Sequence, residues 1–192
     1  RLRLVQANPQ GILFVGADTW VRAIAKALRE EDCPVFLVDT DWNNIRRCRM
    51  AGLPCIYGSA LAEPTREGID YAGLGRMLAV TPNDEVNSLA CLRYAEDFGR
   101  GAVYQLFFSG VSGGRNEPVP AEQRGRLLFG EHLTFDAVTE FAGPQPQVRK
   151  TKLTEEFDFD DFLAEYRDDV LPVFVLRPDK TVQIFTADSA DP

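Results

Sequence analysis

Short apolar runs alternate with amphipathic stretches along the first 108 residues. Apolar runs of strand length occupy 12–15, 34–39, 53–58, 76–81 and 102–108. Between them, residues 21–28 show helical spacing, and 41–52 and 83–99 form polar helical patterns that each end at a glycine. Strands separated by helices pair in parallel through right-handed crossovers. The pattern therefore predicts an α/β fold with a Rossmann-like, doubly wound parallel sheet.

The pattern changes after residue 108. Residues 109–125 are rich in glycine, proline and polar side chains, which predicts a mobile surface loop. A sixth strand is expected over 126–130 and a helix over 133–143, followed by a hinge-like PQPQ stretch at 144–147. Beyond it lie a Phe-rich acidic helix and two strand-like runs. We expect a Rossmann-like lobe over 1–143 and a small α+β appendage over 144–192.

The composition indicates a globular protein and argues against several partners. The chain has 192 residues, of which 45% are hydrophobic and 26% charged, so it can bury a full core. Its net charge of −8 argues against a nucleic-acid surface, which needs clustered Lys and Arg. No apolar run approaches the roughly 18 residues of a membrane span, so we expect no direct membrane insertion. The sequence begins with arginine in place of an initiating Met, so we expect it to be a fragment.

Four cysteines and a single histidine offer little to a metal centre. Cys33, Cys48, Cys55 and Cys91 form no C-x-x-C pair, and His132 is the single histidine. We expect reduced, mostly buried thiols of a cytosolic protein, with no metal and no disulfide framework.

The loop after the first strand begins like a dinucleotide-binding fingerprint and then departs from it. Gly16 allows the tight turn, but Asp18 and Val21 stand where G-x-G-x-x-G has its second and third glycines. Asp39 ends the second strand. In a dinucleotide-binding fold, an acid at this strand end, about 20 residues after the glycine-rich turn, binds the ribose hydroxyls. The alternative is that Asp39 only opens a turn with Thr40 and Asp41. If Asp18 caps the helix, its carboxylate occupies N–H groups that a phosphate would use.

Two further turns resemble a known family. The third strand ends in Gly58-Ser59-Ala60, and the fourth is followed by Thr81, Asp84 and Asn87 in a Thr-x-x-Asp-x-x-Asn pattern. These turns resemble those of the cytosolic RCK, or Trk-type NAD-binding (TrkA-N), domains, except that Ser59 replaces an aspartate. The strings LAVTPNDEVNSLA and VYQL look most like the C-terminal domain of bacterial monovalent cation:proton antiporters. The resemblance covers residues 11 to about 108 well and the last third loosely.

The resemblance implies a regulatory module and no catalysis. A nucleotide would change the geometry of a homodimer, and the motion would pass to a membrane-embedded antiporter or channel subunit, most simply in the same polypeptide, with this domain at its cytoplasmic side. The ligand would be NAD(H) or an adenine mononucleotide, AMP or ADP, bound weakly or not at all. The implied cofactor-binding residues are Gly16, Ala17, Asp18, Asp39, Thr40, Gly58, Ser59, Ala60, Thr81 and Pro82.

Two other functions stay open. An NAD-dependent oxidoreductase needs a proton-transfer group beside the nicotinamide, and the strand ends near Gly58, Thr81 and Phe108 supply none at a telling position. The other alternative is a dimerisation scaffold that binds no nucleotide. Only the loop around Asp18 distinguishes this hypothesis from that of a nucleotide sensor. For the dimer contact we expect the helix bearing Leu133, Phe135, Val138 and Phe141.

Two motifs are interpreted as coincidences. Residues 110–114 match the G-x-S-x-G elbow of serine hydrolases, but no helix can begin directly after them. Asp158, Asp160 and Asp161 suggest a calcium loop, but Leu163 and Asp169 stand where such a loop needs Gly and Glu. We interpret the acidic segment as a solvated helix face with an aromatic underside.

Overall fold

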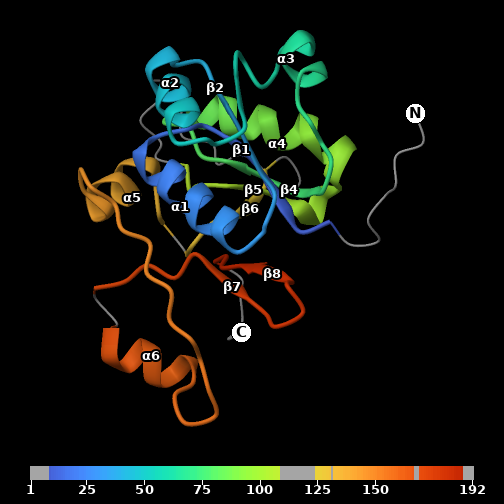
Figure 1. Cartoon of the computed structure of the whole chain (residues 1–192). Helices are drawn as coiled ribbons and strands as arrows, with labels where there is room; N and C mark the ends of the chain where they lie inside the picture. The colour runs from blue at the N-terminus through green and yellow to red at the C-terminus, as the bar shows by residue number, and fades with distance from the viewer. Residues whose placement is uncertain (1–8, 109–123, 131, 167–168, 188–192) are drawn as a thin grey trace.

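The computed structural model describes residues 9–108, 124–130, 132–166 and 169–187, and its largest element is a six-stranded sheet (Figure 1). All five strand pairings are parallel, and the spatial order is β3-β2-β1-β4-β5-β6. This order reverses direction between β1 and β4, which makes their carboxyl ends the switch point of the sheet. The strands are β1 Gly11–Val15, β2 Val35–Asp39, β3 Cys55–Tyr57, β4 Leu74–Ala79, β5 Val103–Gln105 and β6 Arg126–Leu127.

Helices connect the strands and cover both faces of the sheet. The helices of the sheet region are α1 Thr19–Glu30, α2 Trp42–Met50, α3 Glu63–Glu67, α4 Asp84–Phe98 and α5 Phe135–Ala142, with a short 3-10 turn at Arg100–Ala102. One core cluster joins side chains of α1 to Ile12 and Phe14 of β1, and the other joins α4 to Leu13 and Val15. Because successive side chains of a strand point to opposite faces, β1 is buried on both sides, as its continuous apolar run predicts.

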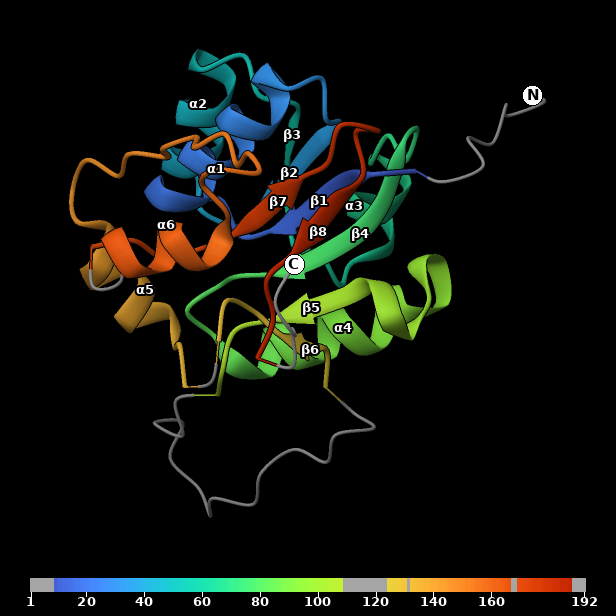
Figure 2. The ribbon, with the colours of Figure 1, turned by 90° about the horizontal axis from the view of Figure 1, so that it is seen from below.

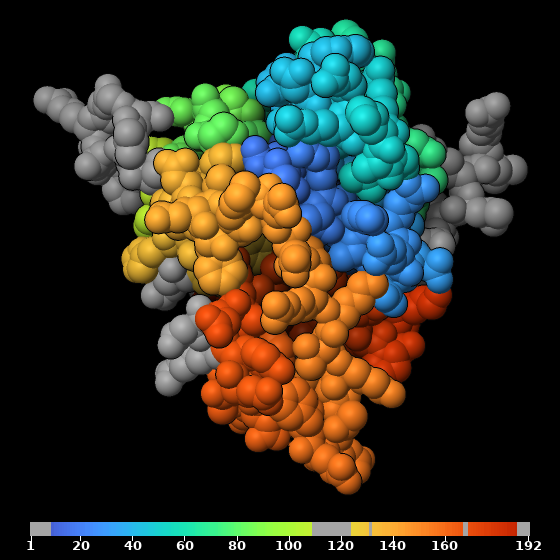
Figure 3. Space-filling view, turned by 60° about the vertical axis from the view of Figure 1, so that its left-hand side comes forward, coloured from blue at the N-terminus to red at the C-terminus, as the bar shows by residue number. Residues whose placement is uncertain are grey.

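The C-terminal segment forms a helix and a hairpin, and the hairpin packs against the α1 side of the core. Helix α6 spans Phe159–Tyr166, and β7 Phe174–Leu176 pairs antiparallel with β8 Val182–Ile184. Val182 and Ile184 are buried in the same cluster as α1. Figure 2 shows the hairpin lying next to the sheet, and Figure 3 shows the segment before α6 running along the lower part of the molecule. The division at residue 143 stays a prediction.

The sequence analysis identified the six sheet strands, and the main differences lie at their edges. The sixth strand is confined to Arg126–Leu127 because the chain then turns at Phe129, whose φ is +63°. Helix α3 was missed, since its five residues, EPTRE, carry no apolar periodicity. Most of the loop predicted over 109–125 lies outside the described residues. Within the described part of the chain, no helix is long and apolar enough to cross a membrane.

The four cysteines are free thiols, as expected, and three of them are buried. Burial raises the pKa of Cys33 to about 11 and the pKa of Cys48 and Cys91 to about 12. Only thiolates attack disulfide reagents. We therefore expect a single fast-reacting thiol, the half-buried Cys55, when the native protein is treated with an aromatic disulfide at pH 8. The other three should react only on unfolding. Substitution Cys55→Ser should remove the fast phase, and fast reaction of two or more thiols would contradict this packing.

Candidate functional site

Gly16 makes the turn that opens the carboxyl edge of the sheet. Its φ is +111°, and a Cβ placed there would lie 2.6 Å from the carbonyl oxygen of Val80. A side chain at this position would therefore be strained and would collide with the end of β4. The Gly16 amide donates to the carbonyl of Val38 at 2.8 Å. The turn thus lies against the ends of both neighbouring strands.

The carboxylate of Asp39 accepts hydrogen bonds from two backbone amides and one side chain. Its Oδ2 accepts a hydrogen bond from the Ala17 amide at 2.7 Å and another from Asn44 Nδ2 at 3.0 Å. Its Oδ1 accepts from the Asp41 amide at 2.8 Å. Both readings of Asp39 from the sequence thus have a structural counterpart: it opens the turn after β2, and it faces the loop where a nucleotide would lie.

Asp18 begins helix α1 and caps it. It is the N-cap residue, and its Oδ1 accepts from the Thr19 amide. The capping expected from the sequence is confirmed, and a carboxylate therefore stands at the helix N-terminus where a phosphate oxygen would bind. Val21, in the position of the third fingerprint glycine, is fully buried between the helix and the sheet. It fills space that a glycine would leave for closer approach.

Arg22 and Asn44 link the two loops from the sides. The Arg22 guanidinium donates to the carbonyl of Ala17, to Thr19 Oγ1 at 2.9 Å and to Asn44 Oδ1 at 3.1 Å. Because Asn44 also donates to Asp39, the chain from Arg22 to the Asp39 carboxylate is continuous. The sequence analysis missed both residues, because a polar residue inside a helix gives no signal of its tertiary partner.

The turn after β3 lies beside Asp39 as the family resemblance implies. The Gly58 amide donates to the carbonyl of Asp39 at 2.9 Å, and its φ of +151° excludes a side chain, which would collide with Thr65 Oγ1. Ser59 Oγ accepts from the Leu61 amide at 3.3 Å. The carbonyl of Ala60 accepts from the buried Tyr94 hydroxyl at 3.0 Å. Ser59 therefore helps to shape the turn itself.

The turn after β4 is held by a side-chain clamp. Asn87, 1% exposed, accepts from both the amide and the hydroxyl of Thr81, at 3.0 and 2.8 Å, and donates to its carbonyl at 2.9 Å. Asn83 caps α4 by accepting from the Val86 amide at 2.9 Å. Thr81 is thus committed to the turn, and the exposed Pro82 lies at its rim.

The predicted site residues come together at the carboxyl ends of β1 to β4. Ala17 and Gly58 both contact Asp39 directly, and Gly16 packs against the strand end that leads into Thr81. Thr40, exposed after β2, lies on the same edge. The edge also carries Asp41, which caps α2. Three carboxylates, those of Asp18, Asp39 and Asp41, are therefore present with the single Arg22 guanidinium among the residues described here.

The two motifs set aside in the sequence give no second site in the described part of the chain. The G-x-S-x-G motif at 110–114 lies outside the described residues. Asp158 and Asp161 bond reciprocally to each other's backbone amides at 3.0 and 3.2 Å, which starts α6. The rings of Phe159 and Phe185 stack at 5.2 Å, so the aromatic underside is confirmed. Among all the residues that the structure describes, no group of His, Cys, Asp and Glu has the arrangement of a metal site.

The Asn87 clamp yields a stability prediction. Asn87→Ala leaves the Thr81 amide and carbonyl without their side-chain partners in a buried turn, which we expect to cost about 2–4 kcal/mol of unfolding free energy. Urea unfolding followed by circular dichroism measures this. The control is Asn43→Ala on the exposed side of α2, expected within about 0.5 kcal/mol of wild type. Equal midpoints for the two variants would show that the clamp is not important for stability.

Comparison with known proteins gives one family match, over residues 12–104, to the TrkA-N domain. No curated protein matches the chain. Among solved structures, the chain is similar to the NAD(P)-binding domain of an exopolyphosphatase-related protein from Archaeoglobus fulgidus, with 15% identity, a TM-score of 0.44, and coverage of 52% of this chain and 74% of that one.

Two further solved structures are similar at the same level. The TrkA-N domain of inner membrane protein ybaL from Escherichia coli has 13% identity and a TM-score of 0.43 over 53% of this chain and 77% of that one. The GsuK channel bound to NAD has 18% identity and a TM-score of 0.43 over 54% of this chain, but the match spans only 19% of the channel chain. The family match confirms the resemblance seen in the sequence: residues 12–104 belong to the TrkA-N domain family.

Proposed function

We propose that this chain is a regulatory, non-enzymatic TrkA-N module that senses an adenine nucleotide and transmits its state to a monovalent cation:proton antiporter or a related cation transport system at the cytoplasmic side. The observation that carries the proposal is the place of Asp39. Its carboxylate lies at the end of β2 and contacts the Ala17 amide, so one acid joins the ribose position to the phosphate loop.

The carboxylates at this edge disfavour a ligand that must place its phosphates at the N-terminus of α1. A carboxylate about 5 Å from a phosphate charge, at an effective dielectric near 20, costs about 3 kcal/mol. A helix N-terminus returns about 0.3–1 kcal/mol. A dinucleotide must carry its pyrophosphate past Asp18, which caps α1, whereas the terminal phosphate of AMP can turn away from the loop toward water. The ligand we propose is therefore AMP, bound weakly through Asp39 and the turn at Gly58, in preference to NAD(H) or ADP.

A change at Asp39 would be transmitted through hydrogen bonds that already exist. A ribose that takes over the carboxylate competes with the Ala17 amide and with Asn44 for the same oxygen. Asn44 holds Arg22, which in turn bonds the Ala17 carbonyl. Binding thus alters how the N-terminus of α1 is tied to α2. This bond exchange is the local event that a regulatory module needs.

One observation keeps the oxidoreductase as a second candidate. The His132 ring lies edge-on to Phe107 with ring centroids 4.9 Å apart, and Phe107 follows β5 near the carboxyl edge of the sheet. A histidine there could exchange a proton with a substrate. Assay of NADH oxidation against small carbonyl compounds decides between the two, since the sensor shows no turnover.

Most of the α5 surface expected at the dimer contact is engaged inside the chain. Leu133 and Phe135 pack against the core and Val138 is 3% exposed, so this face of α5 is used within the chain. Three of the four residues expected at the contact are therefore engaged inside the chain, because periodicity reveals an apolar face but not its partner, while Phe141 is 52% exposed. On α4, by contrast, Leu89 and Leu92 are 51% and 41% exposed and lie three residues apart. We propose that α4 carries the homodimer contact.

The ligand proposal predicts a charge-specific effect at Asp18. Asp18→Asn keeps a capping oxygen but removes the charge, so we expect NAD affinity to rise at least about tenfold while AMP affinity rises less. Asp18→Gly, which also frees the helix amides, should raise NAD affinity at least as much. Asp39→Ala should abolish binding of AMP. Isothermal titration calorimetry with AMP, ADP, NAD and NADH measures all of these.

The matched control for those titrations is Asp136→Ala, which removes an exposed first-turn aspartate of α5. It should bind AMP as wild type does. Tight NAD binding by the wild type, or no gain in either Asp18 variant, would show that this aspartate does not block the site. Failure of every variant to bind any nucleotide would favour the nucleotide-free scaffold instead.

The dimer proposal predicts dissociation on removing the exposed leucines. We expect light scattering at micromolar concentration to give about twice the 21.4 kDa chain mass. Leu89→Ser with Leu92→Ser should give monomer with an unchanged circular dichroism spectrum, since both side chains are exposed. Phe141→Ser, at a large exposed apolar residue of α5, is the control and should remain dimeric. A wild-type monomer over a wide concentration range, or a dimeric leucine variant, would count against α4.

A further inference from the structure

A second polar cluster lies at the amino end of the sheet, away from the edge that carries Asp39. Arg76 near the start of β4, Tyr104 in β5 and Arg126 in β6 belong to neighbouring strands. Tyr104 pairs with Leu78 on one side and with Arg126 on the other. Since Arg76 and Leu78 are two positions apart, all three side chains lie on the same face of the sheet.

Tyr104 lies on the strand between those of the two arginines and contacts Arg126. It is 5% exposed, and its hydroxyl accepts from Arg126 Nη1 at 3.4 Å, while the Arg126 guanidinium carbon lies 5.4 Å from its ring centroid. Arg126 also donates to Thr186 Oγ1 at 3.3 Å, just beyond the C-terminal hairpin. Because a hydroxyl that accepts one hydrogen bond still holds its own proton, Tyr104 can donate to a further group.

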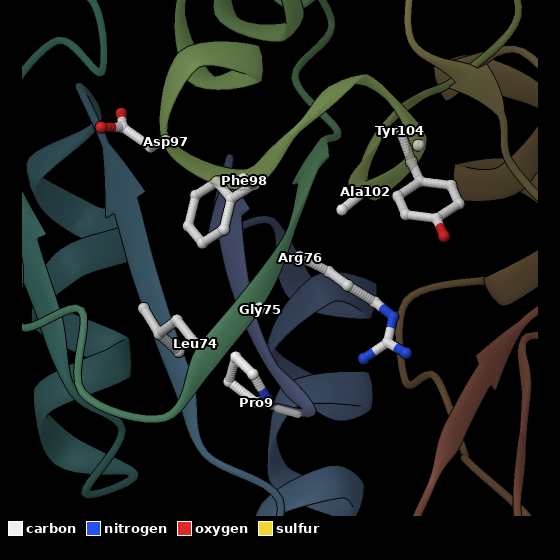
Figure 4. A pocket seen from close by; sticks show the side chains of 9 residues that line it. Pro9, Leu74, Gly75, Arg76, Asp97, Phe98, Ala102 and Tyr104 are labelled. Atoms are coloured by element: carbon white, nitrogen blue, oxygen red, sulfur yellow. The ribbon is translucent and has the colours of Figure 1, made fainter. Parts of the chain in front are cut away.

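A cavity of about 380 Å³ opens beside this cluster (Figure 4). It is lined by Arg76 and Tyr104 on one side and by Phe98 and Asp97 on the other. Figure 4 shows the Arg76 guanidinium and the Tyr104 hydroxyl on the same side of β4, with Asp97 at the far side. Asp97 forms an ion pair with Arg66 at 2.7 Å. The carboxylate in the cavity is therefore already neutralised, and the guanidinium end stays positive.

Neither arginine has a carboxylate partner among the described residues. Arg76 donates to the carbonyl oxygen of Gln10 at 3.3 Å, and the partners of Arg126 among the described residues are the hydroxyls of Tyr104 and Thr186. The ion pairs between described residues are all formed by arginines and lysines other than Arg76 and Arg126. In a chain with a net charge of −8, two arginines without acidic partners around one buried tyrosine hydroxyl indicate a site for an external anion.

We propose that Arg76, Arg126 and Tyr104 bind a small phosphate-class anion, either inorganic phosphate or the phosphate group of a small monoester. The guanidinium groups supply the charge, and the Tyr104 hydroxyl donates the hydrogen bond between them. Because Arg126 also holds Thr186, the bound anion ties β4 to the chain just after the hairpin. The site is independent of the nucleotide proposal, since none of its residues contacts Asp39 or the loop after β1.

Calorimetric titration of the whole chain with inorganic phosphate tests the proposal, at constant ionic strength set with sodium chloride. We expect saturable binding to the wild type and a higher melting temperature in phosphate than in chloride. Arg76→Gln and Arg126→Gln should each weaken binding at least about tenfold, the usual effect of losing a charge-assisted hydrogen bond. Tyr104→Phe, which removes only the hydroxyl, should weaken it several-fold.

Three controls make the outcome decisive. Arg46→Gln, an exposed arginine of α2, and Asp136→Ala, an exposed aspartate of α5, should both bind phosphate as the wild type does. No saturable binding to the wild type, or equal weakening by Arg46→Gln, would overturn the proposal. The variant with Asp188→Asn and Asp191→Asn tests whether the chain's own last carboxylates hold these arginines. Phosphate binding by that variant but not by the wild type would also overturn the proposal.

Discussion

The hydrogen bond from the Ala17 amide to the Asp39 carboxylate is the interaction on which the candidate site depends. It joins the turn after β1 to the end of β2, and the same carboxylate orders the start of α2 through the Asp41 amide. Gly16 makes the contact possible, because any side chain there would meet the end of β4. Arg22 and Asn44 extend the link to both helices. The loop is therefore already closed by groups of the chain, and a ligand must compete with them.

This closed arrangement accounts for the departures from the dinucleotide fingerprint. A glycine at position 18 would leave the amides of α1 free, whereas Asp18 caps them. Val21 fills the space between α1 and the sheet with a buried side chain. Both residues stabilise the loop with groups of the chain itself. They leave Asp39 in place at the end of β2, which is why the proposed ligand is held by its adenosine end.

Local patterns predicted the fold and the position of the site, but not the site's internal contacts. Alternating strands and helices placed Gly16, Asp39, Gly58 and Thr81 at one edge of a parallel sheet, because all carboxyl ends of such strands meet there. Arg22 and Asn44 were missed, since their partners come from tertiary packing and leave no periodic signal. Helix α5 showed an apolar face, but its sequence could not reveal that Phe135 packs on Trp20, with ring centroids 6.0 Å apart.

Amide hydrogen exchange at Ala17 and Asp41 tests the central claim most directly, because the account requires that one carboxylate holds both amides. In the ligand-free wild type, both should exchange at least about tenfold more slowly than in Asp39→Ala, while amides of α4 exchange equally in the two proteins. Saturating AMP should change the exchange of Ala17 in the wild type alone. Equal rates at Ala17 and Asp41 in the wild type and the variant would contradict the claim that Asp39 closes this loop.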